Sequence, residues 1–285
     1  MPASVGIAGT GKMGTAIACN LLERGYRVAV WNVDSAMTAP SVAAGAAQFD
    51  DVEALVNGVD EVVASLWDDA VARDVSLGRI IPAARPGQLF LEFTTLSPQM
   101  YETLAAAAAE RGVDFIACPV IGSVDGARSG SLTLYPGGLR DAVERAAPLL
   151  RAIGSSIHVT GSPGASGHLK LAANCMLAVL ADSLGELLGI LRRAGVDRSL
   201  AVETLIFMLE RVATKRGQLL ELDAKARFSA GALLKDLELA RFAREGLGVA
   251  APLVAAASSE FERVAASGLE EEDYIAVALA LERRF

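Results

Sequence analysis

A single charged side chain stands in a long uncharged stretch of the sequence. Lys170 is the only residue with a full charge at neutral pH between Arg151 and Asp182, and its neighbours are leucines and alanines. Burial lowers the pKa of a lysine toward neutrality, which suits its amine to give or take a proton. The alternative is a structural lysine whose stem covers apolar surface while its ammonium reaches water. Asn174, one helical turn further on, could hydrogen-bond a substrate oxygen beside the lysine and favours the catalytic interpretation.

Near the start of the chain, three glycines separate a short apolar run from an apolar, helix-forming segment. Gly9, Gly11 and Gly14 have the spacing G-x-G-x-x-G. In a strand–turn–helix unit the first glycine allows a tight turn, the second lets a pyrophosphate approach the backbone, and the third lets the helix pack on the strand. A purely structural turn is the alternative. A second strand candidate, residues 27–32, ends about twenty residues later, as a dinucleotide-binding βαβ unit requires.

The N–H groups at the start of the helix that follows this turn would face the phosphates. Lys12 and Met13 occupy these positions, between Gly11 and Gly14. We therefore expect Gly9, Gly11, Lys12 and Met13 to contact the cofactor.

Two other segments follow predicted strands, where loops of open α/β sheets border the ligand crevice. Residues 118–131 are rich in glycine, so that backbone N–H groups could approach an anionic or carbonyl-bearing ligand; a plain glycine-rich connection is the alternative. Thr94 and Thr95 stand in the same relation to the strand candidate 88–93. Thr95 is accordingly expected at the cofactor.

Two remaining groups of polar residues are weaker candidates. Lys235 and Asp236 adjoin on a predicted helix with acidic and basic neighbours, where a solvated face or a structural ion pair is the simpler interpretation. His158 and His168 are not spaced as a ligand pair and have no carboxylate cluster nearby, so we expect no metal site.

Strands and helices alternate over the first part of the chain and give way to helices alone in the second. Besides residues 27–32, the strand candidates are 61–67, 88–93, 114–118, 131–135 and 156–159, and the helix candidates include 52–56 and 98–111. This alternation predicts an α/β protein with an N-terminal doubly wound parallel sheet of the Rossmann type. Residues 1–162 are the expected dinucleotide-binding domain. Residues 163–285 are the expected all-helical substrate and dimerisation domain, joined by a long helix over about 165–193.

Composition bounds the class of protein. The net charge is −8 with both signs scattered, so we expect no nucleic-acid partner. The start of the chain lacks a leader pattern, and later apolar segments carry charges or glycines, so we expect no membrane partner. The three cysteines, Cys19, Cys118 and Cys175, lie in apolar segments as expected buried free thiols, which fits the cytoplasm. A helical half this apolar predicts a homodimer or homotetramer.

Four motifs in order make nearly the whole chain resemble the β-hydroxyacid dehydrogenase family. This family includes 3-hydroxyisobutyrate dehydrogenases, tartronate semialdehyde reductases and glyoxylate/succinic semialdehyde reductases. The matching segments are residues 9–14 with Ala18 and Asn20, residues 119–123 with Gly126 and Gly130, residues 164–170 with Asn174, and residues 235–237 with Gly246 and Pro252.

The resemblance implies hydride transfer between a nicotinamide cofactor and a β-hydroxyacid or related alcohol. It makes Lys170 the general acid/base and Asn174 its partner in holding the substrate. It places Ile121, Gly122 and Ser123 in the substrate loop, and Lys235 in a segment that faces the cofactor.

One position departs from the family pattern. The substrate loop of such enzymes usually has a serine where this chain has Ile121. In the family the serine hydroxyl lies near the substrate carboxylate. Its loss weakens the hydrogen bonding of that carboxylate by about 1.5 to 3 kcal/mol unless Ser123 or a backbone N–H replaces the hydroxyl. This favours a less polar carbonyl compound, or an imine. Imine reductases usually carry an acid or a tyrosine at the position of Lys170, so the lysine favours carbonyl chemistry.

The cofactor is expected to be NAD or NADP, with NAD favoured. Asn32, Val33 and Asp34 end the second strand candidate, where NADP-binding enzymes commonly place an arginine for the 2′-phosphate. Asp34 would repel that phosphate, and Asn32 would hydrogen-bond the ribose hydroxyls. A different class stays open, a dinucleotide-binding sensor without turnover, although a sensor has no reason to keep Lys170 and Asn174.

Overall fold

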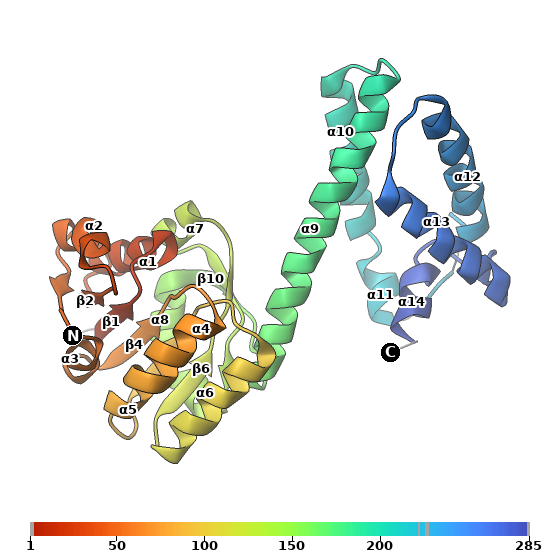
Figure 1. Ribbon diagram of the computed structural model, residues 1–285. Helices are drawn as coiled ribbons and strands as arrows, with labels where there is room; N and C mark the ends of the chain where they lie inside the picture. Colours follow the sequence, from red (N-terminus) through yellow and green to blue (C-terminus); the bar gives the residue numbers. More distant parts are fainter. Residues whose placement is uncertain (1–2, 222, 226–227, 284–285) are drawn as a thin grey trace. The chain divides into compact units, whose positions relative to one another are not determined.

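A computed structural model describes residues 3–221, 223–225 and 228–283, with only the backbone of residues 242–244. The chain forms two compact units, residues 1–174 and 175–285 (Figure 1). The boundary expected from the sequence lies at 162/163. The first turns of the long helix α9 (Pro163–Arg193), which include Lys170, thus belong to the first unit.

A seven-stranded sheet runs through the first unit in the order β3-β2-β1-β4-β5-β6-β9. Neighbouring strands are parallel, except that β9 is antiparallel to β6. The strands are β1 (Ser4–Ala8), β2 (Arg27–Trp31), β3 (Ala47–Gln48), β4 (Glu61–Ala64), β5 (Leu89–Glu92), β6 (Asp114–Ala117) and β9 (Gly137–Gly138). Strand order reverses between β1 and β4, and the ends of these strands therefore open the crevice of a doubly wound sheet.

A smaller sheet, in the order β10-β8-β7, lies beside the glycine-rich loop. It consists of β7 (Val120–Ile121), β8 (Leu132–Leu134) and β10 (Gly154–Ile157). The helices of the first unit are α1 (Lys12–Glu23), η1 (Ser35–Thr38), α2 (Ala39–Ala43), α3 (Val52–Asn57), α4 (Asp69–Ala72), the π-helical η2 (Arg73–Ile80), α5 (Ile81–Ala83), α6 (Pro98–Glu110), α7 (Val124–Ser129) and α8 (Arg140–Ile153).

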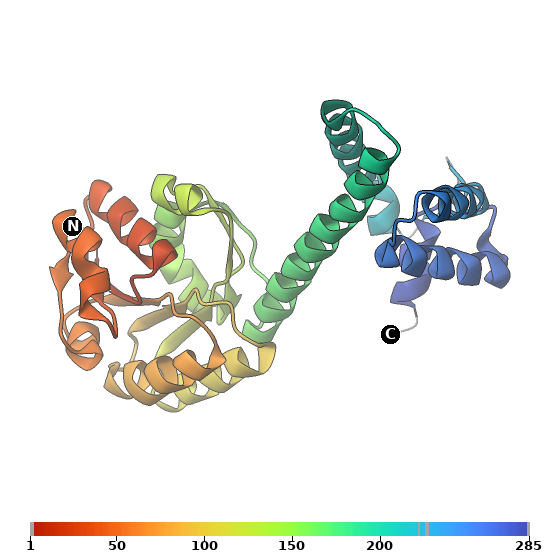
Figure 2. The same cartoon turned by 45° about the horizontal axis from the view of Figure 1, so that its top comes forward.

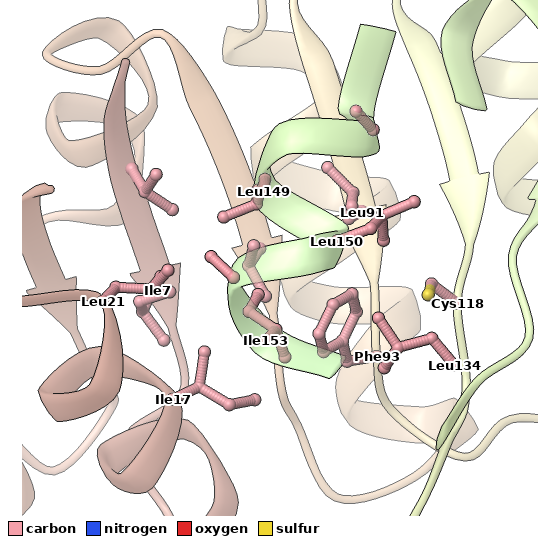
Figure 3. Packing of buried hydrophobic residues seen from close by; sticks show 14 of the residues in the cluster. Ile7, Ile17, Leu21, Leu91, Phe93, Cys118, Leu134, Leu149, Leu150 and Ile153 are labelled. Atoms are coloured by element: carbon pink, nitrogen blue, oxygen red, sulfur yellow. The ribbon is translucent and has the colours of Figure 1, made fainter. Parts of the chain in front are cut away.

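Two apolar layers enclose the main sheet, because its parallel strands are buried on both faces. On one face Ile7 and Leu91 of the sheet pack with Ile17 of α1 and with Leu149 and Ile153 of α8 (Figure 3). The other face is covered by α3, α5 and α6, which bury the second cluster. Figure 2 shows the helices of the first unit on both sides of the sheet. The predicted doubly wound α/β fold is confirmed.

The turn between β1 and α1 is built by close backbone contacts. Gly9 has a φ of +96°, and a Cβ there would overlap the carbonyl oxygen of Ser65 after β4. A Cβ on Gly14 would overlap the carbonyl oxygen of Gly9. The N–H of Gly9 donates to the carbonyl of Trp31 at 2.8 Å, which joins the turn to β2. The G-x-G-x-x-G spacing therefore brings α1 down onto the ends of β1, β2 and β4.

The second unit is helical. Besides the later part of α9 it contains α10 (Arg198–Ala213), α11 (Arg216–Glu221), α12 (Ala230–Gly246), α13 (Pro252–Val264), the π-helical η3 (Ala265–Leu269) and α14 (Ala276–Glu282). The Glu186 carboxylate of α9 caps α13 by accepting hydrogen bonds from the N–H groups of Leu253 at 2.8 Å and Val254 at 3.1 Å. A buried ion pair of 2.7 Å joins Lys215, which precedes α11, to Asp273, which precedes α14.

Helix α9 is continuous over thirty-one residues, as Figure 2 shows. By length and composition alone it is apolar enough to cross a membrane, and none of its most apolar window is buried within the chain. The expectation that every later apolar segment carries charges or glycines too often to span a bilayer is therefore wrong for α9 by this criterion, because an uncharged run separates Lys170 from Asp182. The expectation that every cysteine is buried is also wrong, since Cys175 on this helix is exposed.

The contact at Gly14 makes a prediction about stability. We expect Gly14→Ala to lower the free energy of unfolding by about 3 kcal/mol, the upper end of the usual cost of overpacking, because the new methyl group meets backbone that cannot move aside. Helix propensity alone would instead make this change stabilising by about 1 kcal/mol. Urea unfolding followed by circular dichroism measures the difference.

The matched control is Gly11→Ala. Gly11 has a φ of −62°, and apart from its neighbours in the chain no described residue comes within 4 Å of the position a Cβ would take. Its variant should lose at most about 1 kcal/mol, the cost of a poorer N-cap residue. Equal losses in the two variants would contradict the packing role assigned to Gly14.

Candidate active site

A cavity of about 550 Å³ opens at the carboxyl ends of the strands in the first unit. The turn after β1 contributes Gly11, Lys12 and Met13 to its wall, and α1 adds Ile17. No side chain caps the start of α1, so its first N–H groups and the Lys12 ammonium are placed to receive phosphate oxygens. The residues present therefore fit the pyrophosphate of a dinucleotide.

The strand ends next to the turn supply the rest of the wall. Ser65, Leu66 and Trp67 follow β4; Phe93, Thr94 and Thr95 follow β5; Val120 and Gly122 follow β6; and Lys170 comes from α9. The sequence placed residues 61–67 in one strand, but β4 ends at Ala64. For this reason the sequence did not predict that Leu66 and Trp67 line the cavity. The general rule that the crevice lies beyond the strand ends would have identified them.

Thr94 is held by a buried hydrogen-bond network. Its N–H and its hydroxyl both donate to the Glu92 carboxylate, whose other oxygen accepts from the Ser76 hydroxyl at 2.6 Å. The Thr94 hydroxyl in turn accepts the N–H of Leu66 at 2.7 Å, which joins the loops after β4 and β5. Burial raises the pKa of Glu92, and the hydrogen bonds from Ser76 and Thr94 offset this rise only in part. This carboxyl fixes the floor of the cavity and does not line it.

Lys170 is placed by the packing of the first turns of α9. The N–H of Gly164 donates to the Glu102 carboxylate at 2.7 Å, and Gly167 is buried where a Cβ would crowd Tyr101 and Pro98 of α6. Lys170 itself is half-buried, and burial lowers its pKa. Within the described residues no carboxylate lies at ion-pair distance from it. Its amine is therefore available to exchange a proton with a ligand.

Three of the expected substrate residues do not line the cavity. Ile121 is half-buried in β7, where it pairs with Thr133, and its neighbours Val120 and Gly122 form the wall instead. The Ser123 hydroxyl caps α7 by accepting the N–H of Gly126 at 3.1 Å. Asn174 is exposed, one turn beyond Lys170. Their contacts with substrate stay predictions.

The expected cofactor-sorting residues lie at the end of β2. The Asn32 side chain accepts the N–H of Thr10 and donates to the carbonyl of Asp34, each at 3.0 Å. Val33 is 87% exposed, and the Asp34 carboxylate accepts the N–H of Ala36. Asn32 thus connects the glycine turn to the loop where the adenosine ribose is expected.

Lys235 lies in the second unit, on α12, and forms an ion pair of 3.1 Å with Asp236. Its contact with the cofactor stays a prediction. In the part of the chain that the structure describes, no group of three or more histidine, cysteine or acidic residues could hold a metal ion. The chemistry of the cavity is therefore that of a phosphate-binding turn beside a lysine of lowered pKa.

Family models match both halves of the chain. Residues 4–161 match the NAD-binding domain of 6-phosphogluconate dehydrogenase. Residues 164–281 match the NAD-binding domain of NADP-dependent 3-hydroxyisobutyrate dehydrogenase. The 2-(hydroxymethyl)glutarate dehydrogenase of Eubacterium barkeri is 31% identical over 96% of this chain and 93% of its own length. The chain belongs to the β-hydroxyacid dehydrogenase family.

Two further likenesses extend this result. The NAD-dependent L-serine dehydrogenase of Pseudomonas aeruginosa is 29% identical, with 96% of each chain covered. An imine reductase from a Pseudomonas species shares the fold, with a TM-score of 0.87 at 19% identity over 99% of this chain and 100% of its own. As a β-hydroxyacid dehydrogenase family member the protein is an NAD(P)-dependent oxidoreductase acting on CH–OH groups, as the sequence resemblance predicted.

The pKa of Lys170 makes a prediction about pH. Oxidation of an alcohol needs the neutral amine as base, so its kcat/KM should rise with pH and level off above the pKa of Lys170; reduction should fall through the same pKa. Because burial lowers this pKa, the midpoint should lie below the ordinary lysine value of about 10.4. Rates in both directions across a pH series measure it.

Two variants test the assignment. Lys170→Ala should lower kcat/KM by about 10²- to 10⁴-fold, the usual contribution of a positioned acid/base. Lys170→Arg keeps the charge but cannot release the proton in this range, so the pH transition should vanish. A transition that persists in Lys170→Arg would show that another group titrates.

Proposed function

We propose that this enzyme interconverts a β-hydroxyacid or related alcohol of modest polarity and its carbonyl compound, with NAD as the preferred cofactor. The observation that carries the proposal is the half-buried Lys170, with lowered pKa, in the same cavity as the phosphate-binding turn. The named activities of the relatives, on 2-(hydroxymethyl)glutarate and L-serine, support a small hydroxylated substrate.

The reaction divides between cofactor and protein. The bound nicotinamide supplies or accepts the hydride. In reduction, the Lys170 ammonium gives a proton to the carbonyl oxygen as negative charge develops on it; in oxidation, the neutral amine removes the hydroxyl proton. The Asn174 amide, one turn along α9, would orient that oxygen. The fixed loops after β5 and β6, with Thr95 and Gly122, would hold the substrate beside the lysine.

The cavity wall supports a substrate of modest polarity. Met13, Leu66, Phe93 and Val120 line it. Ile121, next to Val120 in β7, stands where the family usually has serine, so no hydroxyl is available at that position. The imine reductase likeness concerns the fold. Lys170 favours a carbonyl substrate, since an ammonium of lowered pKa is suited to protonate an alkoxide.

Three features support NAD over NADP. Val33 is exposed where an arginine would bind the 2′-phosphate, and the neighbouring Asp34 carboxylate would repel it. Both ends of the Asn32 amide are anchored to backbone, which holds its side chain at the predicted ribose site. The P. aeruginosa relative is itself NAD-dependent.

A second copy of the chain is proposed to cover the helices of the second unit. Met176, Leu177 and Val179 on α9, and Ile206 and Phe207 on α10, are exposed. The fully buried core of this unit is small by comparison. Apolar exposure on this scale supports an interface between two copies of the chain. We propose a homodimer, which light scattering would report as twice the 29.6 kDa chain mass; a monomeric mass would contradict it.

The free cysteines support the proposed cytoplasmic location.

The test of the function is a substrate panel. Purified protein is assayed with NADH against glyoxylate, succinic semialdehyde, tartronate semialdehyde, less polar keto compounds and cyclic imines, with Lys170→Ala alongside. We expect turnover of a carbonyl compound, highest for the less polar members and lost with the lysine. Turnover of imines alone would favour imine reduction. Cofactor binding without any turnover would favour a sensor.

Cofactor preference is tested at Val33. We expect kcat/KM to be higher with NADH than with NADPH. Val33→Arg should raise the NADPH/NADH ratio by about 10- to 100-fold, since a charge-assisted hydrogen bond contributes about 1.5 to 3 kcal/mol. Val33→Leu, which adds bulk without charge, is the control and should leave the ratio unchanged. A wild-type preference for NADPH would refute the proposed role of Asp34.

A further inference from the structure

The sequence contains two tryptophans with opposite surroundings. Trp31, in β2, is 5% exposed and packs under the guanidinium of Arg79. Trp67, after β4, is 85% exposed. No other ring or cation in the described part of the chain stacks on it. Trp67 also lines the cavity, and an indole there offers a bound ligand the largest aromatic surface that a side chain can supply.

The backbone around Trp67 is anchored on both sides. Before it, the N–H of Ser65 donates to the carbonyl of Ala8 at 2.8 Å, and that of Leu66 to Thr94 at 2.7 Å. After it, the Asp68 carboxylate caps α4 by accepting the N–H of Val71 at 2.9 Å. The indole is therefore presented from a fixed loop, at low cost in backbone entropy when it binds something.

The position of Trp67 indicates what it meets. It lines the cavity together with the phosphate-binding turn and with Thr94, Thr95 and Lys170. In the sheet, β4 lies between β1, which holds the pyrophosphate turn, and β5. The adenosine half of a dinucleotide extends from that turn toward β2, and the nicotinamide half toward β4 and β5. Trp67 thus stands beside the nicotinamide half.

We propose that Trp67 packs its indole against the nicotinamide riboside of the bound cofactor and thereby holds the ring toward Lys170. The inference rests on dinucleotide binding in this cavity. An aromatic face and a heteroaromatic ring stack with a contribution equivalent to about one order of magnitude in affinity. Since the loop is already in place, this contribution appears in cofactor affinity.

Fragment binding tests the inference. The equilibrium dissociation constants of NAD⁺ and ADP are measured by calorimetry on wild type, Trp67→Ala and Trp67→Phe. ADP lacks the nicotinamide riboside and serves as the internal control. We expect Trp67→Ala to raise the Kd of NAD⁺ about tenfold and to leave that of ADP unchanged, and Trp67→Phe to restore most of the NAD⁺ affinity.

Fluorescence gives a second readout that does not depend on affinity. NAD⁺ does not absorb indole emission, so it quenches a tryptophan only by contact. In Trp31→Phe, which retains only Trp67, saturating NAD⁺ should remove most of the emission; in Trp67→Phe, the remaining Trp31 emission should barely change.

The outcomes separate this inference from the proposed function. Three results would overturn the inference while the dehydrogenase function stands. Trp67→Ala could bind NAD⁺ with the wild-type Kd, it could raise the Kd values of NAD⁺ and ADP by the same factor, or the Trp67 emission could persist at saturating NAD⁺. If wild type binds neither ADP nor NAD⁺, the proposed function and the inference fall together.

Discussion

The hydrogen bonds of Thr94 join the segments that form the cavity, and the rest of the site depends on them. Its hydroxyl accepts the Leu66 N–H and donates to the buried Glu92, while its carbonyl accepts the Tyr101 hydroxyl. Tyr101 in turn packs against Gly167, less than one turn before Lys170. One residue thus sets the loops after β4 and β5 relative to the start of α9. A buried network of this kind is rigid only when all its members are satisfied.

Much of the first unit could be predicted from the sequence because its signals are local. Alternating strands and helices gave the doubly wound sheet, and G-x-G-x-x-G spacing gave the turn, since glycine is required wherever backbone meets backbone. Lys170 was found because a charge in an apolar run is conspicuous. It lines one cavity together with five other residues that were predicted from the sequence, namely Gly11, Lys12, Met13, Thr95 and Gly122.

What escaped prediction depends on contacts between distant segments. Whether Val120 or Ile121 faces the cavity is decided by the pairing of β7 with β8, because a strand shows alternate residues to opposite sides. Trp67 was included in a predicted strand, whereas β4 ends three residues earlier, at Ala64. The exposure of Cys175 and of the apolar residues of α9 depends on which other segments pack against this helix. The local sequence pattern of a helix does not contain that information.

The division of the chain after Asn174 has a consequence for how such an enzyme can diversify. Lys170 belongs to the same unit as the phosphate-binding turn, although it lies on the helix that leads into the other unit. The proton-transferring amine and the phosphate-binding turn therefore keep their mutual position within a single core. The loops proposed to hold the substrate, with Thr95 and Gly122, belong to this unit as well. New substrate preferences would then arise from side-chain changes in the loops after β5 and β6, which line the cavity within the same unit.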